Sequence, residues 1–367
     1  MSESELIAAL RLQRVPNIGD ITAKKLISHC GSPSAVFGDK RQHLLKIEGI
    51  GPLTLKGLYD TVHIEEAEAE IAFIKKHGIE VHYFMDDAYP QYLKHCIDAP
   101  ILLFAKGTID LRGKKIISVV GTRNITSYGQ AFCEALIEQL APLDPIIVSG
   151  FAYGVDIAVQ RAAMEKGLQT IGCLAHGLNQ IYPKAHAKYV SAVERNGGFV
   201  TEFWSDSNPD RENFLKRNRI IAGMAEATVV IESAEKGGSL VTADIANSYN
   251  RDVFAVPGRS SDKFSVGCNN LIKQQKAHML TSAADLVYML GWKLEEKPTK
   301  QAQKQLFVEL DDTEQAIYSF LQSNGKQLLD TVALECQLPI FKASSTLLNM
   351  EMKGVVRPLP GKLFEAI

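Results

Sequence analysis

The chain has 367 residues, of which 46% are hydrophobic and 22% charged, and its formal net charge is −2. This length exceeds what one hydrophobic core usually serves, so two or three domains are expected. The near-neutral charge excludes a surface that is basic throughout, but a local basic groove depends on where the charges lie. The six cysteines form no C-x-x-C pair, which argues against zinc ribbons and thioredoxin-type motifs.

The sequence carries no recognisable targeting segment. Its N-terminal residues lack the cationic stretch followed by an apolar one that marks a signal peptide. No apolar run approaches the ~18 residues that a membrane-spanning helix needs. We therefore expect a cytoplasmic protein with no membrane partner.

Residues 1–75 are predicted to form a small helical domain with two glycine-centred turns. The turns at 15–20 and 47–52 precede helical runs at 21–27 and 53–58, which is typical of a pair of helix-hairpin-helix units. Such a turn presents backbone N–H groups to a DNA phosphate. The alternative is a packing module that touches no DNA, because few cations flank the turns. These cations are Lys24, Lys25 and Lys56.

Residues 76–292 are predicted to form a Rossmann-like α/β domain. Apolar runs of a parallel sheet buried on both faces alternate with helical stretches, which indicates an open, doubly wound sheet. A turn followed by an apolar strand is also expected at 98–104. The other predicted strands are 115–120, 145–148, 169–175, 198–201, 228–232 and 252–256.

The C-terminal part is predicted to be a linker and a winged-helix-like domain. Residues 293–306 are polar without a periodic apolar face, which is typical of a linker. Within 307–367, three helices at 313–321, 327–336 and 341–352 precede a small hairpin. Residues 305–367 contain five Lys/Arg and eight Asp/Glu. Because an acidic module binds phosphate poorly, we expect protein contacts or packing here more than duplex binding.

The loop after the first parallel strand is a candidate anion site. Ligands of an open α/β sheet bind at the carboxyl ends of its strands. The loop at 121–129 contains Gly121, Thr122 and Arg123 and leads into a helix. Glycine lets the backbone approach an anion, a helix start supplies free N–H donors, and an arginine fork matches phosphate geometry. The G-x-G-x-x-G spacing is missing, so NAD binding has weak support.

The loop after the next strand, 149–156, offers a second anion-holding turn. Its glycines are Gly150 and Gly154, and no Gly-Lys-Ser/Thr follows, so a P-loop and ATP hydrolysis have no support. Phe151 and Tyr153 are candidates for base stacking, although they equally suit packing beneath the loop. No cofactor is expected.

A cationic cluster gives the strongest local signal. Lys216, Arg217 and Arg219 surround Asn218 in a helical segment at 213–223. Such clusters usually face solvent, but an asparagine between two arginines favours a phosphate-facing role.

Two further segments extend this candidate surface. Lys184 follows a Tyr-Pro turn and is expected on the rim as a point charge. The Gly-Gly turn at 237–238 leads into a helix, for which Ser239 is the expected N-cap.

Six motifs in this order resemble the DprA (DNA-processing protein A, Smf) family of natural transformation over about 80–285. They are G-T-R…S-Y-G, S-G-x-A-x-G-x-D, G-L-x-x-x-Y-P-K, R-N-R-I-I-A-G, G-G-S-L-x-T-A and F-A-V-P-G. The resemblance implies an extended Rossmann fold that dimerises, protects incoming single-stranded DNA, helps load the RecA recombinase and has no known catalytic activity.

The resemblance also implies particular DNA contacts. Carried over position by position, these are Arg123, Lys184, Arg217 and Asn218, with the backbone of Gly150 and Gly154. With their neighbours, the candidate DNA-binding residues are Gly121, Thr122, Arg123, Ser149, Gly150, Phe151, Gly154, Lys184, Lys216, Arg217, Asn218, Arg219, Gly238 and Ser239.

Two other classes of function stay open at this point. A nucleotide hydrolase of the phosphoribohydrolase type needs a positioned carboxylate, for which Asp156 and Glu202 are candidates. Asp156 also suits stabilisation of a helix N-terminus, and Glu202 suits a rim position. A protein scaffold without nucleic acid fits the neutral charge, but the cationic cluster at 216–219 speaks against it.

Overall fold

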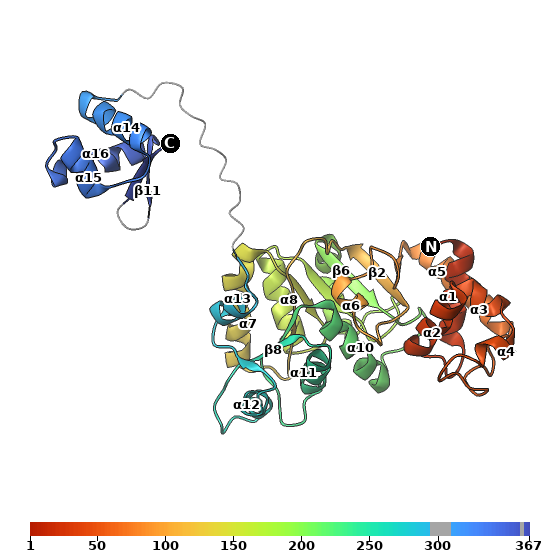
Figure 1. Ribbon diagram of the computed structural model, residues 1–367. Coiled ribbons are helices and arrows are strands. Elements are labelled where there is room, and N and C mark those ends of the chain that lie inside the picture. Colours follow the sequence, from red (N-terminus) through yellow and green to blue (C-terminus); the bar gives the residue numbers. More distant parts are fainter. Residues whose placement is uncertain (294–309, 360–362) are drawn as a thin grey trace. The chain divides into compact units, whose positions relative to one another are not determined.

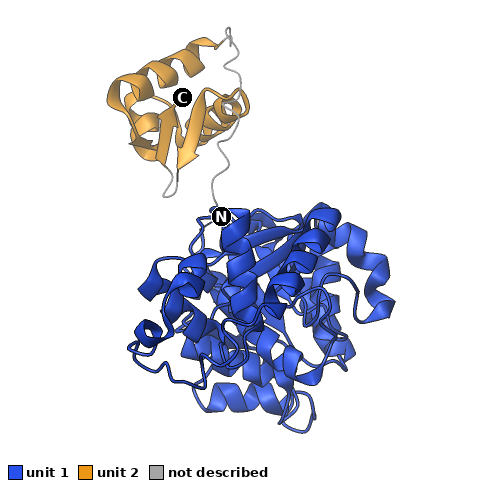
Figure 2. Cartoon of the chain, turned by 90° about the vertical axis from the view of Figure 1, so that its right-hand side faces the viewer, with its two compact units in different colours: residues 1–294 blue, residues 295–367 orange. Residues whose placement is uncertain are grey.

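The computed structural model describes residues 1–293, 310–359 and 363–367 (Figure 1). The chain divides into two compact units, residues 1–294 and 295–367 (Figure 2). The linker predicted at 293–306 lies, apart from its first residue, outside the described residues.

Among the described residues of the larger unit, nine strands form one sheet in the order β1-β2-β6-β5-β4-β3-β7-β8-β9. All neighbours from β6 to β9 pair in parallel, whereas β1 and β2 extend the β6 edge by antiparallel pairing. The strands are β1 (Glu80–Tyr83), β2 (Leu102–Thr108), β3 (Ile116–Val120), β4 (Ile146–Ser149), β5 (Thr170–Cys173), β6 (Gly197–Thr201), β7 (Ala227–Val230), β8 (Asp252–Ala255) and β9 (His278–Met279).

The predicted parallel strands are confirmed, and so is the doubly wound fold. Side chains of β3, β4 and β7 are buried throughout, because helices cover both faces of the sheet. The order β5-β4-β3-β7-β8-β9 is that of a Rossmann sheet. The sequence did not indicate β1 or β9, each of which has four residues or fewer and little apolar pattern.

Two sets of helices cover the sheet (Figure 1). The helices α7 (Ser127–Leu140), α8 (Val155–Glu165) and α13 (Ala283–Met289) pack against one face, around Ile117 and Val119. The opposite face carries Ile116 and Val120. Its helices are α6 (Gln91–Lys94), α10 (Arg211–Met224), α11 (Gly238–Ser248) and α12 (Val266–Lys273). The alternation of consecutive β3 residues between two cores follows from the two-residue period of a strand.

The N-terminal helices share a core with the edge of the sheet. Leu10, Leu26 and Ile71 lie in one apolar cluster with Phe104 and Trp204. The boundary expected between residues 75 and 76 falls inside the last of these helices. They are α1 (Glu3–Arg14), α2 (Asp20–Cys30), α3 (Pro33–Gly38), α4 (Arg41–Leu44) and α5 (Val62–His77).

One predicted helix of this part is wrong. The first glycine-centred turn leads into α2 as expected, but residues 53–58 form turns instead of a helix. Gly57 has φ of +82°, a left-handed backbone conformation that interrupts a right-handed helix.

The smaller unit contains three helices and a three-stranded antiparallel sheet among its described residues. Ile317, Leu321, Val332, Leu347 and Met350 form its core. All three predicted helices are present, although β10 takes the first two residues of the second. The elements are α14 (Asp312–Asn324), β10 (Gln327–Leu328), α15 (Leu329–Glu335), α16 (Ile340–Met352), β11 (Val356–Leu359) and β12 (Leu363–Ala366).

No described helix in either unit combines the length and the apolar character needed to cross a membrane.

We predict that Trp204→Ala destabilises the larger unit by about 3–5 kcal/mol, the usual cost of removing a large buried aromatic side chain. The Trp204 side chain is 5% exposed, its Nε1 donates to Gln13 Oε1 at 2.9 Å, and it packs where α1 meets the sheet. Urea unfolding followed by circular dichroism measures the loss. Ile97→Ala, at a side chain that is 73% exposed, is the control. Equal effects of the two substitutions would contradict the shared core.

Candidate functional site

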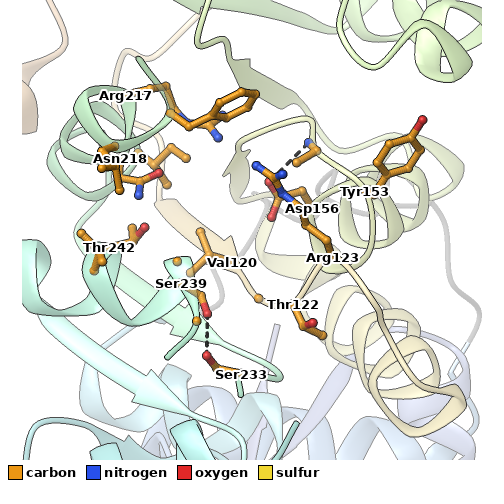
Figure 3. Close-up of a pocket in the computed structure, with 18 of the residues that line it drawn as sticks. Val120, Thr122, Arg123, Tyr153, Asp156, Arg217, Asn218, Ser233, Ser239 and Thr242 are labelled. Carbon is orange, nitrogen blue, oxygen red and sulfur yellow. Dashed lines mark hydrogen bonds between the residues drawn. The ribbon is translucent and has the colours of Figure 1, made fainter. Parts of the chain in front are cut away.

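A cavity of about 790 Å³ lies at the carboxyl ends of β3 and β7 (Figure 3). The chain continues from β3 toward β4 on one side and from β7 toward β8 on the other, so the order of strands reverses between β3 and β7. Open α/β sheets bind ligands at such a reversal. We call this cavity the switch-point pocket. Its walls are the loops 121–124, 152–156 and 233–239 and one face of α10.

Glycines bring the loops after β3 and β4 into direct contact. Gly154 has φ of +78°, and a Cβ there would collide with the carbonyl oxygen of Thr122. A Cβ at Gly121 would collide with the side chain of Val155. These two glycines therefore shape the pocket by allowing close packing of protein against protein.

Gly238 differs from the loop glycines, because a Cβ there would meet nothing within 4 Å. Gly238 is the first residue of α11 and lines the pocket. The N-cap residue of this helix, Gly237, makes no side-chain hydrogen bond to the first backbone N–H groups. The free N–H groups of this helix start are suited to an anion. Ser239 is not the N-cap that the sequence predicted. Its Oγ donates to Ser233 Oγ at 3.0 Å.

Arg217 forms the floor of the pocket and is not solvent-facing. Its side chain is 4% exposed, and Nη1 donates to the carbonyl oxygens of Gly150, at 2.7 Å, and of Cys173. Burial lowers the pKa of Arg217, and nearby Asp156 opposes this effect. A Cβ at Gly150 would collide with this guanidinium. Arg217 thus holds the loop after β4 in place as well as contributing charge.

One face of α10 forms a wall of the switch-point pocket. Phe214, Asn218 and Ile221 line the pocket together with Arg217, at the spacing that one helix face requires. Asn218 is 9% exposed and lies across the pocket from Arg123 and Tyr153 (Figure 3).

Lys216 and Arg219 are not brought to the switch-point pocket, although the sequence placed them with Arg217. Both line a second cavity on the other side of α10. Arg219 pairs with Asp20 at 3.0 Å and with Glu202, so its guanidinium already has acidic partners within the protein.

Of the two candidates for stacking on a DNA base, only Tyr153 has an exposed ring. Phe151 has no exposed surface and packs edge-on against Phe199, with ring centroids 4.9 Å apart, so it offers no face to a base. Tyr153 is 47% exposed and lines the pocket.

Two further candidates do not face the pocket. Ser149 is buried, and its Oγ donates a hydrogen bond to Val119 O at 2.6 Å, which is a structural role. Lys184 is exposed at the start of a 3-10 helix, outside the pocket lining.

Two cations of the pocket belong to no motif that the sequence pattern singles out. Arg211 opens α10 and Lys236 precedes the Gly-Gly turn, and both are exposed lining residues, as is Arg123. Within the described part of the chain, no carboxylate lies within ion-pair distance of these three side chains. Lys236 lies in the loop after β7, so the rule that ligands bind at strand ends could have selected it, whereas Arg211 opens a helix ten residues after β6.

The two candidate carboxylates of the hydrolase hypothesis lie in different cavities. Asp156 is buried in the switch-point pocket, and its Oδ2 accepts from the backbone N–H of Ala152 at 3.3 Å. Burial raises the pKa of Asp156, which Arg217 counteracts. Glu202 lines the second cavity. Asp156 therefore fixes a loop, and Asp156 and Glu202 do not face a common ligand. The described residues contain no cluster of His, Cys, Asp or Glu that is suited to a metal ion.

We predict opposite outcomes for two glycine substitutions at this pocket. Gly154→Ala should cost at least about 1–3 kcal/mol, because it strains the backbone and collides with Thr122. Gly238→Ala should change the free energy of unfolding by less than about 0.5 kcal/mol, because the space around it is open. Thermal or urea unfolding measures both, and equal stability of the two variants would contradict the packing role of Gly154.

Two family models match the chain. The model described as DNA recombination-mediator protein A matches residues 80–291. The model described as the DprA winged helix domain matches residues 297–362, which confirms the winged-helix prediction for the smaller unit.

Curated relatives and solved structures agree with these matches. DNA processing protein DprA of Streptococcus pneumoniae is 38% identical over 203 residues, covering 55% of this chain and 71% of the relative. Protein Smf of Escherichia coli is 33% identical over 276 residues, or 74% of each chain.

The fold is shared as well. The X-ray structure of the Streptococcus pneumoniae protein superposes with a TM-score of 0.67 and 30% identity, over 78% of this chain and 98% of that one. A DNA processing protein A structure from Helicobacter pylori, whose subject is its single-stranded DNA binding mode, gives a TM-score of 0.52 at 27% identity, over 58% of this chain and 95% of that one. The chain therefore belongs to the DprA/Smf family of DNA-processing proteins.

Proposed function

We propose that the protein binds single-stranded DNA in the switch-point pocket and does so without catalysis. The observation that carries this proposal is the convergence of Arg123, Arg211 and Lys236, all exposed and without a carboxylate partner among the described residues, on one cavity. Cations of this kind take phosphates, and the open start of α11 provides N–H donors beside them.

An aromatic surface completes the requirements for a single strand. The exposed ring of Tyr153 is available for base stacking, which contributes about 1–3 kcal/mol per base and tolerates any sequence. Bases of a closed duplex are paired and cannot enter a cavity, so duplex should bind more weakly. The subject of the Helicobacter pylori structure, single-stranded DNA binding, supports the same ligand class.

Family membership supports a finer biological role. We propose that the protein protects incoming single strands during natural transformation and helps load RecA onto them, in the cytoplasm and as a homodimer. A dimer would extend the DNA-binding surface over two copies of the pocket. No cofactor enters this proposal, because the pocket needs only charge, backbone donors and an aromatic face to hold a single strand.

We predict that Arg123→Ala weakens binding of a labelled oligo-dT about tenfold, which corresponds to ~1.4 kcal/mol. Fluorescence anisotropy at several salt concentrations measures affinity, and the magnitude of the salt slope should fall by about 0.7 for each lost phosphate contact. Arg112→Ala is the matched control. Arg112 is exposed and precedes β3, so it lies at the opposite edge of the sheet. Identical binding by both variants, or tighter binding to duplex, would refute the site.

RecA loading has its own test. Wild-type protein should accelerate RecA assembly on single strands that are already coated with a single-strand-binding protein, and Arg123→Ala should do so less in proportion to its lost affinity. RecA ATPase activity on the coated strand reports the assembly. Acceleration that is equally strong with Arg123→Ala would separate RecA loading from the switch-point pocket.

A further inference from the structure

A second cavity of about 590 Å³ lies on the other side of α10, within the larger unit. Its walls come from the first turn of α2, from the segment after β6 and from α10. We call it the α2 pocket. Its lining includes Asp20, Asp98, Glu202, Phe203, Lys216 and Arg219.

The helix α10 is a wall shared by both cavities. Arg217 and Asn218 line the switch-point pocket, whereas Lys216 and Arg219 line the α2 pocket, because neighbouring residues of a helix point in different directions. A helix with its side chains is about 10–12 Å across. Leu215, which is 50% exposed, and the exposed Lys216 form the surface between the cavities. A strand that leaves the first cavity over this surface arrives at the second.

Glu202 lines the α2 pocket and carries a buried hydrogen-bond acceptor without a donor among the described residues. Its side chain is 11% exposed. Glu202 Oε2 accepts from Arg219, whereas Oε1 is buried and receives no hydrogen bond from the described residues. A buried acceptor without a donor is unfavourable, and a ligand N–H would satisfy it.

The charges of this cavity favour a base over a phosphate. Three cations, on Arg14, Lys216 and Arg219, face three carboxylates, on Asp20, Asp98 and Glu202. Such a balanced lining gives an anion no net attraction. Lys216, by contrast, is exposed at the rim and suits a phosphate. The partly buried ring of Phe203 adds an aromatic side chain to the wall.

We propose that the α2 pocket is a second nucleotide subsite for the same strand, with a base held inside and its phosphate at Lys216. A rotation of the Glu202 carboxylate turns Oε1 toward the cavity, where the base donates an amino N–H to it. Cytosine, adenine and guanine carry such an amino group, whereas thymine has none and places its single N3–H between two carbonyl oxygens, which a carboxylate repels. This inference rests on the proposed function of the switch-point pocket and extends its path along the DNA.

The test compares labelled oligo-dC and oligo-dT of about 4 and about 12 nucleotides, a span typical of such sites. Full-length Lys216→Ala should bind the short oligonucleotides like wild type and the long ones about five- to tenfold more weakly. Lys166→Ala is the control, because Lys166 is an exposed lysine at the C-terminal end of α8, on the opposite edge of the sheet. Arg123→Ala should weaken both lengths.

Base preference gives an independent readout. Wild type should bind the long oligo-dC about fivefold more tightly than the long oligo-dT, and Glu202→Gln, which keeps the side-chain volume, should abolish this preference. The preference itself is measured on wild type, so it tests the proposal even where Glu202→Gln does not fold.

Each outcome separates the two proposals. If Lys216→Ala binds both lengths of oligonucleotide as Lys166→Ala does, or loses the same factor of affinity for both, the second subsite is overturned. Neither result affects the proposal for the switch-point pocket. Equal affinity of wild type for the two long oligonucleotides overturns the assignment of Glu202. No single-strand binding by wild type at either length overturns both proposals.

Discussion

A guanidinium buried beneath the carboxyl ends of β4 and β5 holds the site together. Arg217 donates to the carbonyl oxygens of Gly150 and Cys173 and lies near buried Asp156. A buried cation is unfavourable without hydrogen bonds and a counter-charge. The packing of α10 across the sheet therefore depends on these carbonyl oxygens and on Asp156. Gly150 leaves room for the guanidinium, and the loop after β4 then forms a wall of the switch-point pocket.

The helical period divides the cationic cluster between separate roles. Arg217 belongs to the floor of one cavity, whereas Arg219 joins the N-terminal helices to the sheet through Asp20 and Glu202. Burial raises the pKa of Glu202 to about 7, even with Arg219 beside it. The exposed charge that remains for DNA on this helix comes from Arg211 and Lys216.

The N-terminal helices are part of the functional unit through their packing. Trp204 follows β6 in the chain, yet it packs with α1 residues, and Glu70 of α5 accepts hydrogen bonds from Ser205 N and Oγ at 2.9 and 2.6 Å. These contacts join residues more than a hundred positions apart. The composition of 1–75 indicated a separate helical domain because local patterns carry no information about such distant partners.

Local sequence patterns were enough to predict the parallel strands, the doubly wound order of elements and the loops that carry the site. Buried strands require apolar runs, and a backbone position with positive φ, such as Gly154, favours glycine, so local sequence indicates these features. Which side chains face a ligand depends on the tertiary structure. It buried Phe151, enclosed Arg217, paired Arg219 with carboxylates and brought Arg211 and Lys236 beside Arg123. Exposure and ion pairing depend on residues distant in the chain, and a local motif specifies neither.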